Sequence, residues 1–379
     1  MKFRAAGAMV LALALALAVP ACRSPGPTSA AHAQPSGPAP WPEAEALFHQ
    51  EPRWLGGDAS LSIPLEGDRI LWLFGDSFIA TPPRLDRRSA PMVRNSVAIQ
   101  NGRDPARARM DFHWGSTPDG LPSEFFPGGP DHWYWPGHGL QLPDGPLLVF
   151  LFRMVETPGR DLGFAARGYA LAIVANPRDS AGAWRVRIVD APPAPFDAAP
   201  ATAVVHEQGY VVALAIRQQG THAGALVRYR PRHLVMGDLA GAEWWAGVDR
   251  GWVREPALGP DGPAWVMDDA GAEASVHRDA CTGRYVHVAS YGFGDTEIGM
   301  RDAPALVGPW SKPRRVYRPP ESDRPDAFVY AAKAHPWLGG PDEGAAVTYA
   351  TNRFRFEDLV EGPGAYDTYW PRVLRMPGC

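Results

Sequence analysis

Two Gly-Asp pairs, Gly57-Asp58 and Gly75-Asp76, are the residues of this chain whose types and positions could do chemistry. Asp76 directly follows the apolar run ILWLFG at residues 70–75, which is typical of a buried strand. A carboxylate that is buried without a partner costs several kcal/mol. Asp76 must therefore be hydrogen-bonded, stand at a solvated strand end, or take part in a reaction.

The segment that joins the two pairs predicts that they meet. A turn signal at Gly67-Asp68 lies about midway between them, so residues 54–79 should fold back as a hairpin with Asp58 and Asp76 at its open end. Two neighbouring carboxylates repel, which raises the pKa of one of them. Such a pair can supply an acid and a base together, as glycoside hydrolysis requires. The alternative is that one aspartate caps a turn and the other binds a backbone amide.

A recurring turn indicates the elements that must position these residues. Six times, a Gly/Asp turn is followed at once by a run of β-branched or aromatic residues. The turn glycines are Gly67, Gly145, Gly209, Gly262, Gly283 and Gly344. The interval of 21 residues between Gly262 and Gly283 is too short for a four-stranded unit, so we assign both to one unit, which leaves five.

Five turn-rich antiparallel units predict an all-β fold, namely a five-bladed β-propeller. The 14 Trp and 41 Pro residues agree with strands and turns rather than helices. A pair of β-sandwiches is the alternative. In a propeller the innermost strands line a central channel, so polar residues at their ends are the expected functional groups.

The N-terminus predicts export. Residues 1–21 read as a signal peptide, with Lys2 and Arg4 before a short apolar run. Val19-Pro20-Ala21-Cys22 is similar to a bacterial lipobox, so we expect lipidation at Cys22 in the cell envelope, with the protein facing the periplasm or exterior; ordinary cleavage nearby is the alternative. Residues 22–46 are Pro-, Ala- and Ser-rich and predict a tether, followed by one domain at 47–379.

Charge and cysteine usage narrow the function further. Without the signal peptide the chain carries 35 basic and 41 acidic side chains, a net charge of −6, which argues against nucleic acid or anionic lipid as partner. Contact with the membrane is expected only through the anchor, and we expect a monomer. Cys281 and Cys379 are expected to form a disulfide, with two free thiols as the alternative. Zinc-ligand spacings and nucleotide-binding glycine motifs are absent from the sequence, so we expect neither metal nor cofactor.

Several stretches resemble one known family. They include WLGGDAS, LWLFGDSFI and RNSVAI between residues 54 and 99, YWPGHGLQL at 134–142, EASVH at 273–277, residues 298–320, YAAKAHPWL at 330–338, VTYATN at 347–352 and YWPRVLR at 369–375. On these stretches the chain is similar to the domain of unknown function 4185 family, which includes microbial endo-D-arabinanases. The resemblance implies that Asp58 and Asp76 are catalytic, with Glu273 as a third acid.

Sugar chemistry suggests the supporting residues. Asn95 could bind a hydroxyl group or serve only in a turn, and His138 is flanked by glycines that would let a ligand approach. Trp135 could stack on a sugar ring or belong to the core. The predicted substrate-binding set is Arg94, Asn95, Trp135, His138, His206, Tyr291, His335 and Asn352.

Together these residues predict an exported glycoside hydrolase that acts on a furanose-containing polysaccharide, with a D-arabinan as the expected substrate. Two other functions use the same features. One is a non-catalytic glycan-binding propeller on the cell surface. The other is a scaffold for a second envelope protein, which would present a broad apolar patch in place of an acidic pocket.

Overall fold

The computed structural model describes residues 37–159, 163–193, 196–218, 220–259, 261–339 and 344–378. Cys22 and Cys379 lie outside these ranges. The described chain is all-β, as predicted. Its helices are short: α1 (Pro42–Glu45), α2 (Pro231–Met236), α3 (Phe356–Val360) and the 3-10 turns η1 (Ala46–His49), η2 (Ala181–Ala183), η3 (Glu255–Ala257), η4 (Pro320–Asp323) and η5 (Ala365–Asp367). Within the described ranges, none of these helices has the length and apolar character to cross a membrane.

Antiparallel sheets of four or more strands follow one another along the chain. The first has the order β3 (Leu61–Leu65), β4 (Arg69–Phe74), β7 (Ser96–Asn101), β8 (Arg109–His113), and the second β11 (Trp133–Gln141), β12 (Leu147–Glu156), β13 (Phe164–Val174), β14 (Val186–Asp190). The third runs β15 (Ala198–Glu207), β16 (Tyr210–Arg217), β17 (Gly224–Tyr229), β18 (Glu243–Trp245), β19 (Trp252–Arg254), with β20 (Trp265–Met267) also on β17. The fourth runs β21 (Ala274–Arg278), β22 (Tyr285–Tyr291), β23 (Glu297–Ala303), β24 (Arg314–Tyr317).

The last large sheet joins the two ends of the described chain. Its order is β1 (Ala39–Pro40), β27 (Arg372–Arg375), β26 (Ala346–Arg353), β25 (Ala327–His335). Residues 39–45 were predicted to be part of the tether, but β1 pairs with β27 and Trp41 is buried. The prediction was wrong here because a two-residue strand in a Pro-rich stretch has no periodicity, and only its partner strand reveals it.

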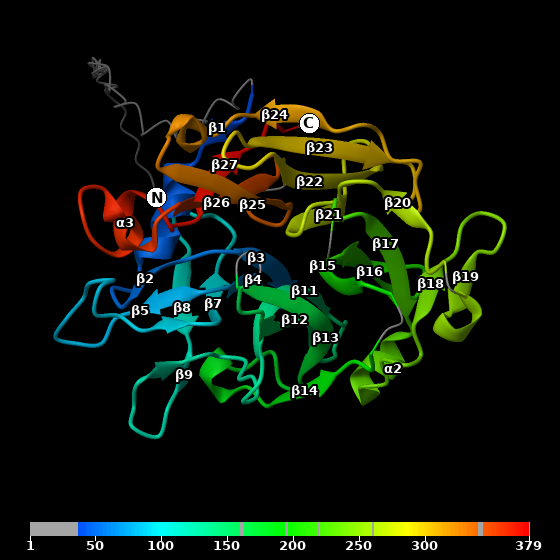
Figure 1. The fold of residues 1–379 in the computed structure, drawn as a ribbon, viewed down its shortest axis with the longest axis horizontal. Coiled ribbons are helices and arrows are strands. Elements are labelled where there is room, and N and C mark those ends of the chain that lie inside the picture. The colour runs from blue at the N-terminus through cyan, green and yellow to red at the C-terminus, as the bar shows by residue number, and fades with distance from the viewer. Residues whose placement is uncertain are drawn as a thin grey trace, which may run out of the picture. The chain divides into compact units, whose positions relative to one another are not determined.

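One outermost strand of each large sheet contacts a strand of the next sheet along the chain (Figure 1). β3 contacts β11, β11 contacts β15, β15 contacts β21, and β21 contacts β25. A hydrogen bond between Ser62 on β3 and His335 on β25 links the first sheet to the last. Two small sheets complete the fold: β2 (Trp54–Gly57), β5 (Ser77–Ile79), β6 (Met92–Val93), and β9 (Gly115–Ser116) with β10 (Pro122–Ser123).

The repeating turns mark one antiparallel strand pair in each large sheet: β3 with β4, β11 with β12, β15 with β16, β21 with β22, and β25 with β26. Gly67, Gly145, Gly209, Gly283 and Gly344 all lie between such strand pairs. Gly262 does not, because it lies in the segment before β20 of the third sheet, whereas Gly283 belongs to the fourth. Assigning both to one unit was therefore wrong, although the number of strand pairs was unaffected.

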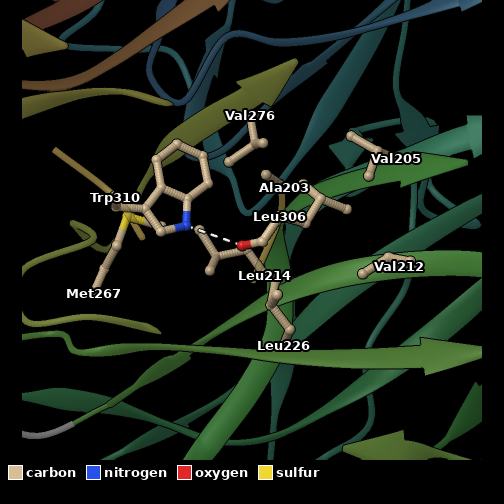
Figure 2. A pocket seen from close by; sticks show the side chains of 9 residues that line it. All are labelled: Ala203, Val205, Val212, Leu214, Leu226, Met267, Val276, Leu306 and Trp310. Atoms are coloured by element: carbon tan, nitrogen blue, oxygen red, sulfur yellow. Dashed lines mark hydrogen bonds between the residues drawn. The ribbon is translucent and has the colours of Figure 1, made fainter. Parts of the chain in front are cut away.

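Apolar side chains fill the space between neighbouring sheets. Ile63 and Leu71 of the first sheet pack in one cluster with Val149 and Ala172 of the second. Between the third sheet and the segment that holds Leu306, a cavity of about 10 Å³ remains, and Figure 2 shows its apolar lining and the hydrogen bond from Trp310 to the Leu306 carbonyl. A cavity this small and apolar is a packing gap rather than a ligand site.

Candidate functional site

One hairpin places Asp58 and Asp76 opposite each other. β3 pairs with β4 through Leu61 and Leu73, and β2 pairs with β5 through Gly57 and Ser77. These two residue pairs keep the same register. Asp58 and Asp76 lie between the two ladders and are therefore opposite each other. The predicted hairpin is present, and its open end continues into a second ladder that holds the aspartates in place.

Asp58 is a partly buried carboxyl group that accepts a short hydrogen bond from a tyrosine. The Tyr330 hydroxyl donates to Asp58 Oδ2 at 2.7 Å. Burial raises the pKa of Asp58 well above its usual range, and the nearby charges of Asp76 and Glu273 raise it further, whereas Tyr330 and Lys333 act against the shift. The surroundings of Asp58 therefore favour its protonated form.

Asp76 has surroundings that favour its charged form more strongly. The Trp135 indole donates to Asp76 Oδ1 at 3.0 Å, and Arg94 Nη1 lies 3.5 Å from Oδ2. Burial raises the pKa of Asp76, but both of these donors lower it. The Tyr369 hydroxyl also donates to the Asp76 backbone carbonyl at 3.0 Å and holds this corner of the chain. The two aspartates of the hairpin thus have different hydrogen-bond partners.

A buried lysine links the aspartate pair to the third predicted acid. Lys333 Nζ lies 3.6 Å from Glu273 Oε1 and donates to the carbonyls of Ala59 and Ala331, the latter at 2.6 Å. Burial lowers the pKa of Lys333, while Glu273 and Asp58 raise it. The charges of Asp76, Glu273 and Lys333 therefore all act on Asp58.

Unfavourable backbone conformations gather at this point. Ala59 and Ser60 have φ of 64° and 56° directly after Asp58, Ala331 has 59° directly after Tyr330, and Tyr369 has 66°. Non-glycine residues in this region cost of order 1 kcal/mol each, and they persist where surrounding structure holds them. Two of these residues, Ala59 and Ala331, are also the residues whose carbonyls accept hydrogen bonds from Lys333.

Glycine at position 75 is required by the closeness of the two aspartates. A Cβ atom on Gly75 would lie 2.4 Å from Asp58 Oδ1. The Gly75 amide also donates to the Asp58 carbonyl at 3.2 Å. The Gly-Asp sequence therefore reflects packing of one aspartate against the backbone that carries the other.

Trp135, Arg94 and Asn352 lie at the site as predicted from sequence. Trp135 and Arg94 contact Asp76, and Arg94 also lies over the Trp133 ring at 4.4 Å. Asn352 Nδ2 donates to the Tyr330 hydroxyl at 3.4 Å, so it supports the residue that binds Asp58. Both Arg94 and Trp135 keep part of their surface exposed.

Two of the three histidines predicted to bind substrate, His138 and His335, have structural roles instead. His138 is buried, accepts at Nδ1 from the Val204 amide at 3.0 Å and donates through Nε2 to the Ser62 carbonyl at 3.2 Å; burial lowers its pKa to about 4. His335 is also buried, between the hydroxyls of Ser62 at 2.5 Å and Thr348 at 2.7 Å, and its pKa is well below the usual range because of burial. Both rings are neutral and use their nitrogens inside the protein.

The glycines beside His138 do not open a path for a ligand. A Cβ atom on Gly137 would lie 2.3 Å from the Ala201 carbonyl oxygen, and one on Gly139 would lie 2.0 Å from that of Leu148. These glycines let neighbouring strands approach β11. The prediction that His138 faces a sugar was wrong because close packing requires the same residue type as ligand approach.

Asn95 is likewise a structural residue. It is fully buried, donates to the carbonyls of Phe126 at 3.1 Å and Tyr134 at 2.9 Å, and accepts from the Phe126 amide at 2.7 Å. These bonds join the residue before β7 to β11 and to the segment that precedes β11, and they occupy the side chain within the protein.

His206 and Tyr291 are not brought to the carboxyl groups. His206 is exposed near the end of β15, whereas Trp135 and Glu273 lie at or just before the beginning of β11 and β21. Tyr291 is buried, and its hydroxyl accepts from Arg301 Nε at 3.1 Å. The direction of the strand and the side of the sheet to which the side chain points determine whether such a residue reaches the carboxyl groups. Neither can be read from the position of a single residue in the sequence.

Sequence reasoning missed Tyr330, Lys333 and Tyr369. Tyr330 and Lys333 both lie in the stretch YAAKAHPWL, from which only His335 was selected. A lysine inside an apolar strand was the available signal, because a buried ammonium group needs several partners. Tyr369 had no comparable signal, since its role depends on a contact with the distant Asp76.

The predicted disulfide and the metal expectation concern other parts of the chain. Cys281 is disulfide-bonded, while Cys379 lies outside the described residues, so the Cys281–Cys379 pairing stays a prediction. Within the part of the chain that the structure describes, no group of three or more His, Cys, Asp or Glu side chains is arranged to hold a metal ion.

Comparison with known families corrects the resemblance drawn from sequence. Residues 43–378 match the family model described as "Domain of unknown function (DUF5005)". The domain of unknown function 4185 assignment was therefore wrong. The stretches that suggested it are short turn-and-strand pieces of the sequence. No curated protein matches the chain.

Solved structures resemble the chain at low sequence identity. A "putative hydrolase" from Bacteroides ovatus ATCC 8483 has a TM-score of 0.69 and 17% identity, with 89% of each chain covered. A xylan beta-1,4-xylosidase from Bacillus halodurans C-125 has a TM-score of 0.49 and 11% identity over 86% of this chain and 56% of its own. An endo-arabinase from Bacteroides thetaiotaomicron VPI-5482 has 0.43 and 12%, covering 85% and 94%. At 17% identity, the likeness to the Bacteroides ovatus structure concerns the fold alone.

Proposed function

The chain belongs to the DUF5005 family. We propose that this member of the family is a glycoside hydrolase built on a five-bladed β-propeller. The five large sheets would be the blades, with β1 completing the last one beside the C-terminal strand β27. Outermost strands of neighbouring sheets contact one another, which supports this arrangement. The candidate site lies where several of these strands begin.

One observation carries the catalytic proposal: Asp58 and Asp76 face each other in one hairpin and have different hydrogen-bond partners. Asp58, whose pKa is raised well above its usual range by burial, would donate a proton to the leaving oxygen. Asp76, which Trp135 and Arg94 hold toward the charged form, would act as base or nucleophile. Glu273 would keep the pKa of Asp58 high, and Lys333 would position both.

The substrate is proposed to be a polysaccharide. Arabinanase specificity was suggested by a family assignment that proved wrong, so a furanose-containing glycan is only the first substrate to test. Export and lipidation at Cys22 are proposed on the sequence of the first 22 residues.

The test is hydrolysis of soluble arabinan, arabinoxylan and galactan by the purified protein, with released sugars measured by chromatography. We expect Asp58→Asn and Asp76→Asn each to reduce the rate by about 10²-fold or more, the range for loss of a general acid or base. Asp119→Asn, which changes an exposed aspartate of the segment between β9 and β10, is the matched control and should keep full activity. Full activity in both site variants would disprove the proposal.

A further inference from the structure

Three phenylalanine rings form an exposed cluster beside the residue that binds Asp58. The ring centroids of Phe293, Phe328 and Phe354 lie 5.1 to 6.0 Å apart. Phe293 and Phe354 are 71% and 51% exposed. The Phe328 ring lies 5.4 Å from that of Tyr330, which donates to Asp58. We call these three residues the phenylalanine platform.

The platform is assembled from three separate segments. Phe328 lies on β25, Phe354 directly follows β26, and Phe293 lies in the segment between β22 and β23. Gly292 and Gly294, with φ of 99° and 81°, shape the backbone on both sides of Phe293. Single exposed apolar residues are common, but adjoining exposed rings from several segments mark an interaction site.

Charged residues near the platform are paired with each other. Arg318 binds Asp295 and Asp323, and Arg353 binds Asp326. The guanidinium groups of Arg318 and Arg353 are thus already neutralised by carboxylates. Aromatic faces carry partial negative charge and attract the weakly positive C–H groups of an uncharged ring. The surface therefore suits a neutral ligand that presents C–H groups and still tolerates water on its other side.

The platform lies next to the tyrosine that binds Asp58, because both have a residue on β25. Phe328 and Tyr330 are two residues apart on β25, so they share a face and lie about 7 Å apart along the strand. Tyr330 therefore connects the platform, through Phe328, to the carboxyl group of Asp58.

We propose that the phenylalanine platform binds sugar units of a neutral polysaccharide next to the unit held at Asp58 and Asp76. This inference rests on the proposed function, because it takes the same glycan as its ligand. It gives the protein a preference for long chains over small glycosides.

The test compares the double variant Phe293→Ala/Phe354→Ala with the wild-type protein. Binding to arabinan, arabinoxylan and galactan is measured by affinity electrophoresis with Asp58→Asn as background, so that hydrolysis does not interfere. We expect at least tenfold weaker binding to the preferred polysaccharide. In the active background, KM for the polysaccharide should rise by a similar factor, while turnover of a nitrophenyl monosaccharide glycoside stays unchanged. Phe356→Ala, a phenylalanine of α3 that is 54% exposed and outside the platform, is the matched control and should bind as wild type.

The outcomes separate this inference from the proposed function. Weaker binding in the double variant alone supports the platform even if no product is ever released, in which case only the hydrolase proposal fails. Hydrolysis with unchanged binding and KM in the double variant overturns the platform and leaves the hydrolase proposal standing. Absence of binding to every glycan of the panel also overturns the platform.

Discussion

At the scale of single residues, the two aspartates differ because of what surrounds them. Asp58 has a phenol as its donor and two acidic neighbours, whereas Asp76 has an indole and a guanidinium group. The same residue type in one hairpin can therefore hold a proton at one position and release it at the other.

The raised pKa of Asp58 predicts a pH-dependent stability difference. A carboxyl group whose pKa is higher in the folded state stabilises the protein while it is protonated, and this contribution is lost as the pH rises through the folded pKa. Asp58→Asn cannot ionise. Its free energy of unfolding, relative to wild type, should therefore increase from pH 4 upward by about 1.4 kcal/mol for each unit by which the pKa is raised.

Urea unfolding at a series of pH values measures this difference. Asp119→Asn, at an exposed position, should follow the wild-type curve throughout. A constant difference between Asp58→Asn and wild type across the pH range would contradict the assignment of Asp58 as the readily protonated group.

Gly75→Ala should disturb the aspartate pair directly. The added methyl group would lie 2.4 Å from Asp58 Oδ1, so the carboxyl group or the β4 end must move. We expect a loss of about 1 to 3 kcal/mol in the free energy of unfolding, as for other overpacked sites, together with reduced activity. Urea unfolding and circular dichroism measure the effect. Gly37→Ala, where nothing lies within 4 Å of the new methyl group, should be neutral, and equal behaviour of both variants would refute the argument.

At the scale of elements, the N-terminal strand β1 belongs to the last sheet. β1 pairs with β27, the Trp41 amide donates to the Val373 carbonyl at 2.7 Å, and Arg375 lies over the Trp41 ring at 4.2 Å. These contacts fasten the beginning of the folded region to its end.

Removing this element should weaken the whole sheet. A protein of residues 47–379 lacks β1, Trp41 and Ala44, all of which a protein of residues 37–379 retains. Loss of the buried tryptophan alone should cost about 3 to 5 kcal/mol. Comparison of the two proteins by urea unfolding checks this, and equal midpoints would show that β1 contributes nothing.

At the scale of the whole molecule, one buried arginine connects distant parts of the chain. Arg87 donates to the carbonyls of Leu55 at 2.8 Å, Ala365 at 2.6 Å and Thr368 at 2.9 Å. Burial lowers the pKa of its guanidinium group to about 10. One of these segments also carries Tyr369, which contacts Asp76. Arg87 therefore stabilises the segment that holds Tyr369 in place.

Arg87→Met should destabilise the protein although it removes no contact with a ligand. Several buried carbonyls would lose their donor, and each unsatisfied group costs about 1 to 3 kcal/mol. We therefore expect a loss of about 3 kcal/mol or more by urea unfolding. Arg88→Met changes a neighbouring arginine that is exposed and forms a surface ion pair with Glu361, so it should have little effect; a similar loss in both variants would contradict the role of Arg87.

Much of the arrangement was determined locally by the sequence. The hairpin of residues 54–79 follows from apolar strands around a Gly-Asp turn, and the recurring turns mark one strand pair of each large sheet, because turn chemistry and strand alternation act over a few residues. The opposition of Asp58 and Asp76 is a consequence of that local register.

Only the tertiary structure decided which other residues join them. Tyr330 and Lys333 reach Asp58 and Glu273 from the last sheet, whereas His138, His335 and Asn95 satisfy their polar atoms within the protein. A polar residue looks the same in sequence whether it faces a cavity or a neighbouring carbonyl. Its role depends on contacts between sheets that lie hundreds of residues apart, and the packing of those sheets determines which polar atoms remain free for a ligand.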